Sequence, residues 1–457
     1  MFGSVQNIHF VGIGGIGMSG IAEVLVNLGF NVSGSDIKVS AITSRLSELG
    51  VVINIGHDAQ RVRNAHVLVV SSAVKPDNPE VQAASIAKIP VIPRGEMLAE
   101  LMRMKEGVAV AGAHGKTTTT SMIAHILSVG GLDPTVVVGG KLGILGSNAK
   151  LGKGPTLVAE ADESDGSFLM LSPTWAIITN IDREHLDHYK DLDEIKDSFV
   201  AFANKVPFYG CALVCMDCPN TASIRPRLRR QVRTYGTTPQ MDIQARNIAQ
   251  DGFSTRFDVR AFENDLGKFS LSVPGRHMVL NALAAIGMAL EMGVGVSVIR
   301  EALSEFTGAE RRFTFKGERD GVLVVDDYGH HPTEIAATLS GARPGFPDRR
   351  IVAAFQPHRY SRTQALLDEF ARAFFEADVV VVSDIYPASE APIPGLTGQT
   401  LVDALRAVGQ REVHYIPDIQ NMPKALREIT RPKDLLLTFG AGSITQVGPA
   451  FLEGVRD

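Results

Sequence analysis

Cysteine, tryptophan and long apolar runs are scarce in this chain of 457 residues. It contains three cysteines and one tryptophan. So few cysteines exclude a fold built on disulfides and are typical of a reducing compartment. No apolar run approaches the roughly 18 to 20 residues that span a bilayer, and the first residues lack a basic stretch followed by an apolar one. We therefore expect a cytoplasmic protein with no membrane insertion.

An excess of basic residues is also lacking, since 45 Lys and Arg face 50 Asp and Glu and the formal net charge is −5. A nucleic-acid binder usually carries a basic stripe. We interpret the arginines at 225–230 as a solvated face, and we expect no nucleic-acid partner. The cysteines at 211, 215 and 218 lie close together, but a zinc site needs a fourth ligand. CALVC at 211–215 is better explained as a buried strand.

Short β-branched runs alternate with helical patterns along the whole chain, which is typical of parallel α/β sheets. The pattern predicts three α/β domains. We expect a Rossmann-like domain at 1–106, a central P-loop ATPase-type domain with a mostly parallel sheet at 107–317, and a second Rossmann-like domain at 318–457. Ligands bind beyond the carboxyl ends of strands in such sheets, so each domain should offer one ligand-facing edge.

The first glycine loop has the pattern GxGxxG, formed by Gly12, Gly14 and Gly17 between a strand and a helix. Such glycines let the backbone turn tightly around a pyrophosphate at a helix N-terminus. Asp36 ends the next strand, where dinucleotide-binding folds place a ribose-binding carboxylate. The loop predicts a diphosphate site but does not say what the diphosphate carries, so both NAD and a UDP-sugar stay open.

The second glycine loop, AGAHGKTTTT at 111–120, also follows a strand and opens a helix. Lys116 can reach β- and γ-phosphates, and Thr117 can ligate Mg²⁺. The usual spacing would place a glycine at 110, where Val110 stands, and Gly112 is closer to the lysine. The sequence therefore predicts a variant phosphate loop.

Acidic residues follow two later strands of the central segment. Magnesium prefers hard oxygen ligands, so these strand ends are candidate metal-binding edges. The first cluster is Glu160, Asp162, Glu163 and Asp165, and the second is Asn180, Asp182, Glu184, His185 and Asp187.

Two motifs in the last segment, DDYGHHP at 326–332 and QPHRYSRT at 356–363, each lie at a strand end. Guanidinium groups pair bidentately with carboxylates, so these residues are expected to recognise a small carboxylate if their strands are neighbours. His330 and His331 alone do not make a zinc site. The residues expected at this edge are Tyr328, His330, His358, Arg359 and Arg362.

Seven motifs, covering nearly the whole chain in order, resemble those of the Mur ligases. They are GIGGIGMSG, AGAHGKTTTT, EADESDGSF, TNIDREHLDHY, PGRH, DDYGHHPTE and QPHRYSRT. Within the family the motifs are closest to the member that attaches L-alanine. The resemblance implies a ligase that uses ATP and Mg²⁺ to join L-alanine to UDP-N-acetylmuramate through an acyl phosphate. Phosphorylation would give the carboxylate a leaving group, while the protein positions the reactants and neutralises charge.

The resemblance also implies roles for individual residues. The residues implied to bind the UDP-sugar are Gly15, Ile16, Gly17, Met18, Ser19, Asp36, His57, Ser71, Ser72 and Arg94. ATP binding falls to Gly112, Ala113, His114, Gly115, Lys116, Thr117, Thr118, His277, Asn281, Arg312 and Asp327. The metal ligands would be Thr117, Glu160 and His185, and the catalytic residues Lys116, His185 and Arg312. Alanine would be placed by Tyr328, His330, His358, Arg359 and Arg362.

Three positions depart from the family pattern. Ala113 stands where Thr is usual, Met278 where Asn is usual, and Ser443 where Asp is common. None of them is Lys116 or an expected metal ligand, so the activity is still expected.

Three other functions are compatible with parts of the sequence. A murein-recycling ligase that attaches a ready-made tripeptide to the same UDP-sugar shares most motifs. An NAD-dependent dehydrogenase would explain the first loop but not GKTTTT or the acidic clusters. A non-catalytic nucleotide-binding module would bind ATP without turnover. The sequence leaves a monomer or a homodimer open.

Overall fold

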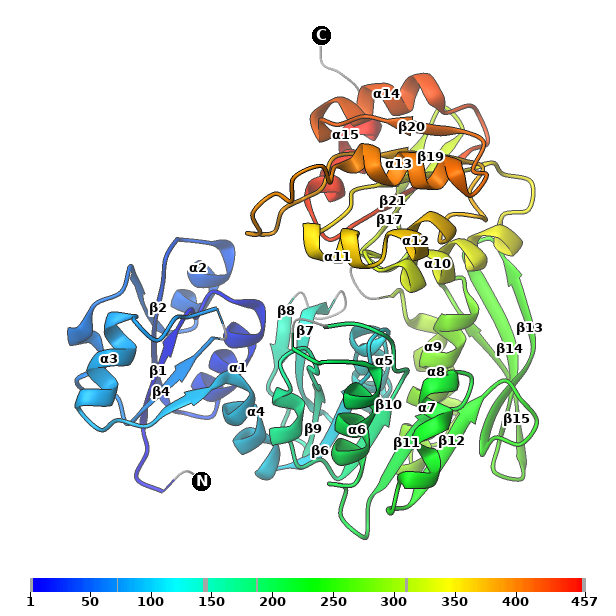
Figure 1. Ribbon diagram of the computed structural model, residues 1–457. Helices are drawn as coiled ribbons and strands as arrows, with labels where there is room; N and C mark the ends of the chain where they lie inside the picture. Colours follow the sequence, from blue (N-terminus) through cyan, green and yellow to red (C-terminus); the bar gives the residue numbers. More distant parts are fainter. Residues whose placement is uncertain (1–2, 72, 143–146, 186–187, 309–310, 454–457) are drawn as a thin grey trace. The chain divides into compact units, whose positions relative to one another are not determined.

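The computed structural model describes residues 3–71, 73–142, 147–185, 188–308 and 311–453 (Figure 1). Two expected site residues, Ser72 and Asp187, lie outside this part of the chain. The chain forms two compact units. The first comprises Met1–Arg246, Asp258–Phe269 and Leu280–Ala309, and the second comprises Asn247–Phe257, Ser270–Val279 and Glu310–Asp457.

The first domain is built on a five-stranded parallel sheet with the order β3-β2-β1-β4-β5. This order reverses between β1 and β4, and ligands of doubly wound sheets bind at such a point. The expected Rossmann-like sheet is therefore confirmed. The elements are β1 (Asn7–Val11), α1 (Ile16–Asn27), β2 (Asn31–Asp36), α2 (Ala41–Glu48), β3 (Val52–Ile55), β4 (Val67–Val70), α3 (Pro79–Ile86), β5 (Val91–Pro93) and α4 (Arg94–Arg103).

The central sheet has ten strands in the order β15-β14-β13-β12-β11-β10-β6-β9-β7-β8. Strands β6, β7, β9, β10, β11 and β12 pair in parallel, whereas β7 and β8 are antiparallel. The loop before α5 therefore leaves the sheet between the ends of β9 and β10. The elements are β6 (Glu106–Ala111), α5 (Lys116–Val129), β7 (Thr135–Leu142), β8 (Ser147–Lys150), β9 (Thr156–Glu160), β10 (Trp175–Ile178), α6 (Leu192–Ala203), β11 (Cys211–Cys215), α7 (Pro219–Ile224), β12 (Val232–Gly236), β13 (Ile243–Asp251), β14 (Ser254–Ala261), β15 (Asn264–Leu271), α8 (Arg276–Glu291) and α9 (Val296–Glu305).

The C-terminal sheet has six strands in the order β16-β17-β21-β18-β19-β20, and only the β16–β17 pair is antiparallel. The domain boundary expected after residue 317 falls inside β16. The elements are β16 (Thr314–Arg319), β17 (Val322–Asp327), α10 (Pro332–Gly345), β18 (Ile351–Phe355), α11 (Tyr360–Ala365), α12 (Leu367–Arg372), β19 (Val379–Val382), α13 (Gly398–Ala407), β20 (Val413–Tyr415), α14 (Met422–Ile429), β21 (Leu435–Phe439) and α15 (Val447–Glu453).

Both faces of the inner strands of the C-terminal sheet, β17, β21, β18 and β19, are buried, which explains why these strands are mostly apolar without alternation. Ala353 of β18 and Leu437 of β21 join one core cluster, whereas Val352 and Leu436 join the cluster on the other face. Successive side chains of a strand point to opposite faces, so a sheet covered on both sides needs apolar residues at every position.

Strand β11 confirms the interpretation of CALVC as a buried strand, because all five of its residues are buried. Burial raises the pKa of the Cys211 and Cys215 thiols to about 12. Cys218 is partly exposed at the start of α7, and all three cysteines are free thiols.

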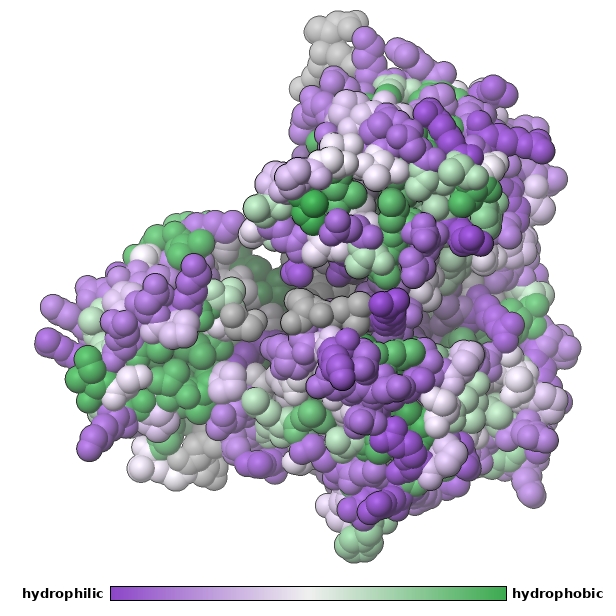
Figure 2. All heavy atoms as spheres, viewed as in Figure 1, coloured by the Kyte–Doolittle hydropathy of each residue, from purple (hydrophilic) through white to green (hydrophobic). Residues whose placement is uncertain are grey.

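Hydrophilic and hydrophobic residues lie side by side on the visible face of both units (Figure 2). Among the described residues, no helix combines the length and the apolar character that crossing a membrane requires.

Candidate active site

A pocket of about 450 Å³ lies at the point where the first sheet reverses its strand order. Gly12 follows β1, Ser71 follows β4, and His57 follows β3; all three line this pocket. Gly15 also lines it and is the N-cap of α1, where it places no side chain over the first turn. The pocket therefore faces a helix N-terminus, which favours a negatively charged group.

Met18 and Ser19 in the first turn of α1 can meet a bound group mainly through their backbone. The side chains of Met18 and Ser19 are buried, with exposed fractions of 1% and 2%. Asp36 lines the pocket and accepts a hydrogen bond from the backbone N–H of Gly14 at 2.8 Å. A Cβ at Gly14 would lie 2.8 Å from Oδ2 of Asp36, so this contact requires glycine. Asp36 therefore fixes the loop as well as facing the pocket.

Arg94 connects the first domain to the acidic turn after β9. Its Nη2 lies 3.0 Å from Oδ2 of Asp162. A Cβ at Gly17 would lie 2.6 Å from Nη1 of Arg94, so the guanidinium packs against the first turn of α1. The Arg94 guanidinium therefore lies beside both the N-terminus of α1 and the first acidic cluster.

The loop before α5 depends on two glycines with positive φ. Gly112 has a φ of +136°, and a Cβ there would lie 2.0 Å from Oγ1 of Thr179. Gly115 has a φ of +83° and caps α5, and a Cβ there would lie 2.5 Å from Oδ1 of Asn281. Asn281 of α8 therefore packs against the loop.

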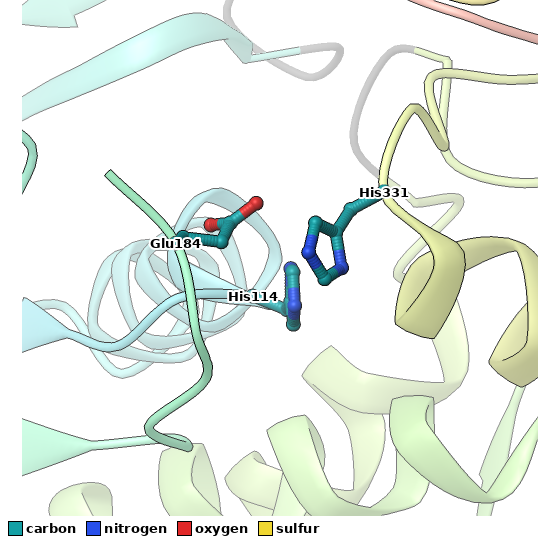
Figure 3. Close-up of side chains that lie close together, drawn as sticks. All are labelled: His114, Glu184 and His331. Atoms are coloured by element: carbon teal, nitrogen blue, oxygen red, sulfur yellow. The ribbon is translucent and has the colours of Figure 1, made fainter. Parts of the chain in front are cut away.

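Residues after β10 hold the same loop in place. Asn180 accepts from the backbone N–H of His114 at 2.8 Å and donates to the His114 carbonyl at 2.9 Å. The His114 ring lies 3.0 Å from Oδ2 of Asp182. Figure 3 shows His114 in the loop before α5 and Glu184 in the segment that follows β10. The polar residues after β10 thus position the loop as well as offering possible ligands.

Lys116 forms an ion pair with Glu163 rather than pointing freely into solvent. Its Nζ lies 2.8 Å from Oε1 of Glu163 and donates to the carbonyl of Gly112 at 2.6 Å. Burial lowers the pKa of Lys116, but the charge and hydrogen bond of Glu163 outweigh it and raise the pKa to about 12. The lysine is therefore a permanent cation in the loop.

His185 joins the same carboxylate from the segment after β10. Its Nε2 lies 3.7 Å from Oε1 of Glu163 and 3.7 Å from Oε2 of Glu184. Burial lowers the pKa of His185, but the hydrogen bond to Glu163 and the charge of Glu184 outweigh it and raise the pKa. One ligand atom from each of these residues lies within 4.8 Å of the others, so the three could hold a metal ion.

The donor set fits Mg²⁺ in part. Oε2 of Glu163 is buried and has no hydrogen-bond partner within the described residues. Carboxylate oxygen is the ligand that Mg²⁺ prefers, and a bound cation would satisfy this atom. Of the expected ligands, Thr117 is the second residue of α5, and Glu160 ends β9 opposite Val110 of β6. The sequence analysis named Glu163 only as one member of the first acidic cluster and not among the expected Mg²⁺ ligands.

The second unit holds the other residues expected to contact ATP. Asp327 ends β17 and accepts from the backbone N–H groups of Phe313 and Gly329 at 2.9 and 2.7 Å. Burial raises the pKa of Asp327 to about 6, against the opposing charge of Arg312. Arg312 donates to Oε1 of Glu334 at 3.1 Å. Burial, with the positive charge of Arg312, lowers the pKa of His277 to about 4.

The structure brings together the rings expected to place alanine. The ring centroids of Tyr328 and His330 are 5.1 Å apart, and those of His330 and His358 are 6.1 Å apart. His358 also stacks on Tyr386, with centroids 5.4 Å apart and planes at 9°. The Arg311 guanidinium lies 5.1 Å from the Tyr328 ring centroid. Strands β17 and β18 are not neighbours, because β21 lies between them.

Two polar atoms of this cluster are buried without hydrogen-bond partners among the described residues. They are Nη1 of Arg362 and Nδ1 of His358. Burial, with the nearby charges of His330, Arg362 and Arg359, lowers the pKa of His358 to about 4. Arg359 caps α11 with a φ of +71° and donates its backbone N–H to the Tyr386 carbonyl at 2.9 Å. Buried polar atoms are normally satisfied, and Nη1 of Arg362 can only donate, so this atom could bind an acceptor group of a ligand.

The three departures from the family pattern occupy different environments. Ala113 is partly exposed in the loop, and the side chain of Met278 is buried at 2% exposure. Ser443 accepts a hydrogen bond from Nε2 of Gln356 at 3.1 Å. Met278 and Ser443 therefore pack within the second unit.

Sequence reasoning missed several buried acids that hold functional side chains. Glu163 was seen only as one member of an acidic turn, yet it pairs with Lys116. Glu334 pairs with Arg312 and accepts from the backbone of His330 at 3.0 Å. Glu80 of α3 is fully buried behind His57. The placement of Glu334 three residues after His331, in a capping box, was the one local signal.

Three family models cover most of the chain. The Mur ligase family catalytic domain matches residues 7–106, the Mur ligase middle domain matches 110–289, and the Mur ligase glutamate ligase domain matches 311–442. They agree with three α/β domains.

Curated proteins and solved structures are similar over the full length. UDP-N-acetylmuramate–L-alanine ligase of Geobacter sp. (strain M21) is 56% identical, covering 99% of this chain and 98% of its own. The protein of that name from Solibacter usitatus is 57% identical, covering 100% of this chain and 97% of its own. The crystal structure of UDP-N-acetylmuramate-alanine ligase MurC from Thermotoga maritima has a TM-score of 0.81 at 31% identity, covering 98% of each chain. A murein peptide ligase from Psychrobacter arcticus has a TM-score of 0.70 at 26% identity, also covering 98% of each chain. This chain belongs to the Mur ligase family.

Proposed function

We propose that this chain is an ATP-dependent ligase that joins L-alanine to the lactyl carboxylate of UDP-N-acetylmuramate in peptidoglycan precursor synthesis. The observation that carries the proposal is its 56% identity, over nearly the full length of both chains, to a protein named for that reaction.

The first domain is proposed to bind the UDP-sugar. The pocket at the reversal of strand order supports this, because it faces the N-terminus of α1. The diphosphate would lie against Gly15, Ile16 and Gly17, with Arg94 beside it. The nucleoside and sugar would meet Asp36, His57, Ser71 and Ser72.

The loop 112–118 is proposed to bind the phosphates of ATP, with Lys116 beside the transferring group. His277, Asn281, Arg312 and Asp327 complete the proposed ATP site. Thr117, Glu160 and His185 are proposed as Mg²⁺ ligands, and the unpartnered oxygen of Glu163 supports a cation at this edge. Bound Mg²⁺ would neutralise charge on the phosphates.

The reaction proceeds in two steps. A lactyl carboxylate oxygen attacks the γ-phosphorus, and the bond from that phosphorus to ADP breaks. The alanine amine then attacks the acyl carbon, loses a proton, and inorganic phosphate leaves. Lys116 contributes a fixed positive charge to the first step, and its raised pKa keeps that charge at every working pH.

The C-terminal cluster is proposed to hold alanine by its carboxylate. The buried, unpartnered Nη1 of Arg362 supports this role. Arg359 would add charge, and Tyr328, His330 and His358 would shape the site around the small side chain. Burial of the acyl phosphate during the second step would limit competition by water.

Phosphate release measures the proposal directly. We expect ATP-dependent release of phosphate only when UDP-N-acetylmuramate and L-alanine are both present. Release with the tripeptide L-alanyl-γ-D-glutamyl-meso-diaminopimelate in place of L-alanine would assign the chain to the murein-recycling reaction instead. No release with either acceptor would contradict the proposal, as would a nicotinamide absorbance change.

The location and assembly are also proposals. We propose the cytoplasm, a monomer or homodimer, and domains at 1–106, 107–317 and 318–457, with no nucleic-acid partner.

A further inference from the structure

Behind the pocket of the first domain lies a buried polar chain that the reaction does not explain. It runs from His57 at the pocket through Ser35 of β2 to Glu80 in the first turn of α3. Ser35 and Glu80 have exposed fractions of 0%, and the His57 side chain is 20% exposed. A buried carboxylate is costly unless it is hydrogen-bonded, so its retention here calls for a reason.

The hydrogen bonds around Glu80 show that it acts as an acceptor. Its Oε2 accepts from the Ser35 hydroxyl at 2.5 Å, and its Oε1 accepts from the backbone N–H of Asp58 at 3.2 Å. His9 Nε2 lies 3.6 Å away, and Arg61 Nη1 lies 3.9 Å away. Burial raises the pKa of Glu80, but the hydrogen bonds from His9, Ser35 and Asp58 outweigh it and lower the pKa. Glu80 is therefore an ionised group that can only accept.

This fixes the direction of the next hydrogen bond. A serine hydroxyl has one proton, and that of Ser35 is given to Glu80. The Ser35 oxygen, 3.0 Å from Nδ1 of His57, can then only accept. The second acceptor near Nδ1, Oε2 of Glu80 at 3.5 Å, imposes the same requirement. Nδ1 must carry a hydrogen, so in the neutral imidazole Nε2 carries the lone pair.

We propose that Glu80 is a positioning residue which, through Ser35, holds His57 in the Nδ1–H form, so that Nε2 accepts a hydrogen bond from the nucleoside part of the substrate. Among the described residues, Nε2 of His57 makes no hydrogen bond, and the side chain lines the pocket. The matching donor is a ribose hydroxyl or the imide N–H of uracil. The identity of the nucleotide rests on the proposed function, whereas the form of His57 does not.

Ser35 also ties this chain to the glycine loop. Its carbonyl accepts the backbone N–H groups of Gly12 and Ile13 at 2.9 and 3.1 Å. Ser35 therefore orients both His57 and the glycine loop at the diphosphate end of the pocket. The positions of His57 and the loop relative to each other are fixed as a result.

The first experiment measures the form of His57 in the unmodified chain. Two-dimensional ¹⁵N–¹H spectra of the ¹⁵N-histidine-labelled protein distinguish the two neutral forms of an imidazole, and the spectrum of His57→Gln identifies the His57 signals. We expect hydrogen on Nδ1 and a lone pair on Nε2. Hydrogen on Nε2 of the neutral ring would overturn the proposal without any variant of the network having to fold.

The second experiment measures how the network acts on the substrate. The glutamine side chain in Glu80→Gln has N–H donors, so the Ser35 hydroxyl no longer has to donate its proton to residue 80. We expect the KM for UDP-N-acetylmuramate to rise about tenfold, with kcat and the KM for ATP unchanged. Glu23→Gln is the matched control, because Glu23 is also a buried acid of this domain but pairs with Arg45 at 2.6 Å and does not line the pocket.

A double variant separates positioning from mere support of the fold. In the His57→Gln background, Glu80→Gln should add no further rise in KM, because its effect passes through His57. If Glu80→Gln raises the KM equally in the unmodified chain and in the His57→Gln background, the positioning role is refuted. The same holds if Glu23→Gln raises the KM as much as Glu80→Gln does. If Glu80→Gln does not fold, Ser35→Ala removes the same link and is judged by the same KM and kcat criteria.

The last comparison identifies the donor. Uracil carries an N–H at N3 where cytosine carries a lone pair, so CDP should compete more weakly than UDP if His57 meets the base. Equal competition by both, with a loss for 2′-deoxy-UDP, assigns the ribose hydroxyl. If all three bind equally and His57→Gln changes none of them, Nε2 does not contact the nucleoside and the proposal fails. Absence of UDP-N-acetylmuramate turnover with intact UDP binding would instead contradict only the proposed function.

Discussion

Lys116 and Glu163 form an ion pair in which Nζ lies 2.8 Å from Oε1. A nucleotide phosphate bound at this loop, as proposed, would compete with this carboxylate for the ammonium group. The freed carboxylate would then face the same phosphates, and a cation is needed to make this arrangement favourable. The pair explains in one contact why a phosphate loop and an acidic turn occur together.

Lys116→Ala should reduce ATP-dependent phosphate release about a thousandfold, because it would remove the fixed charge that we propose lies beside the transferring group. UDP-N-acetylmuramate binding, measured by calorimetry, should be unchanged. Lys150→Ala is the control, since Lys150 also forms an ion pair, with Asp133 at 2.9 Å. Loss of UDP-N-acetylmuramate binding in Lys116→Ala would show that the assignment of ligands to domains is wrong.

Glu163→Gln should raise the Mg²⁺ concentration needed for half-maximal activity by about tenfold, because the substitution removes one negative charge from the group formed with Glu184 and His185. The measurement is a magnesium titration of phosphate release at saturating substrates. Glu160→Gln, titrated in parallel, tests the ligand that the family resemblance implies. If Glu163→Gln needs no more Mg²⁺ for half-maximal activity than the unmodified chain, the role of Glu163 is limited to holding Lys116.

Arg362→Ala should raise the KM for L-alanine about 10- to 100-fold, because a charge-assisted hydrogen bond to the carboxylate would be lost. The KM for UDP-N-acetylmuramate should stay the same. Arg372→Ala offers a control on the exposed side of the same domain. Equal effects of the two substitutions would argue against a specific contact from Arg362.

Gly112→Ala should abolish detectable ATP binding, because the new Cβ would lie 2.0 Å from Oγ1 of Thr179 at a φ of +136°. Gly131→Ala controls for backbone strain, since Gly131 has a φ of +75° with no atom within 4 Å of its Cβ position. It should lower the free energy of unfolding by about 1 kcal/mol and leave ATP binding intact. Normal calorimetric ATP binding by Gly112→Ala would contradict the loop geometry.

Asp327→Asn should flatten the dependence of stability on pH. Because burial raises the pKa of Asp327 from 3.8 to about 6, its contribution is complete below pH 3.8 and is lost as the pH rises through about 6. The loss amounts to about 3 kcal/mol at most. Urea unfolding at pH 5 and pH 7 should therefore show a smaller fall for Asp327→Asn than for the unmodified chain.

Asp403→Asn is the control for this measurement, because Asp403 is exposed in the same domain, with 66% of its side chain accessible. It should reproduce the fall seen in the unmodified chain. If the free energy of unfolding of Asp327→Asn falls as much between pH 5 and pH 7 as that of the unmodified chain, the carboxyl group of Asp327 titrates normally.

The sequence predicted most of the fold because strand ends and glycine loops are local signals. The pattern of Gly12, Gly14 and Gly17 and the GKT of the second loop each follow a strand and run into the first turn of a helix, as expected. The first strand of the C-terminal sheet, β16, was not foreseen. Its sequence TFKGER is half exposed at a sheet edge, so it lacks the apolar run that identified the other strands.

The partners of the site residues were much harder to predict. Glu80 is separated by 45 residues from Ser35, and Glu163 by 47 from Lys116. Acidic residues are usually exposed, so a sequence gives no reason to select the few that are buried. Only the folded chain shows which carboxylate lies behind which functional side chain.

The sheltered thiols of β11 have a practical consequence for spectroscopy. Reagents that alkylate cysteine react with the thiolate, and a pKa of about 12 keeps Cys211 and Cys215 almost wholly in the unreactive form. Replacing Cys218 alone therefore yields a background on which one introduced cysteine in each unit accepts a fluorescent dye. The distance between the two dyes can then be measured during turnover without altering the interior of the protein.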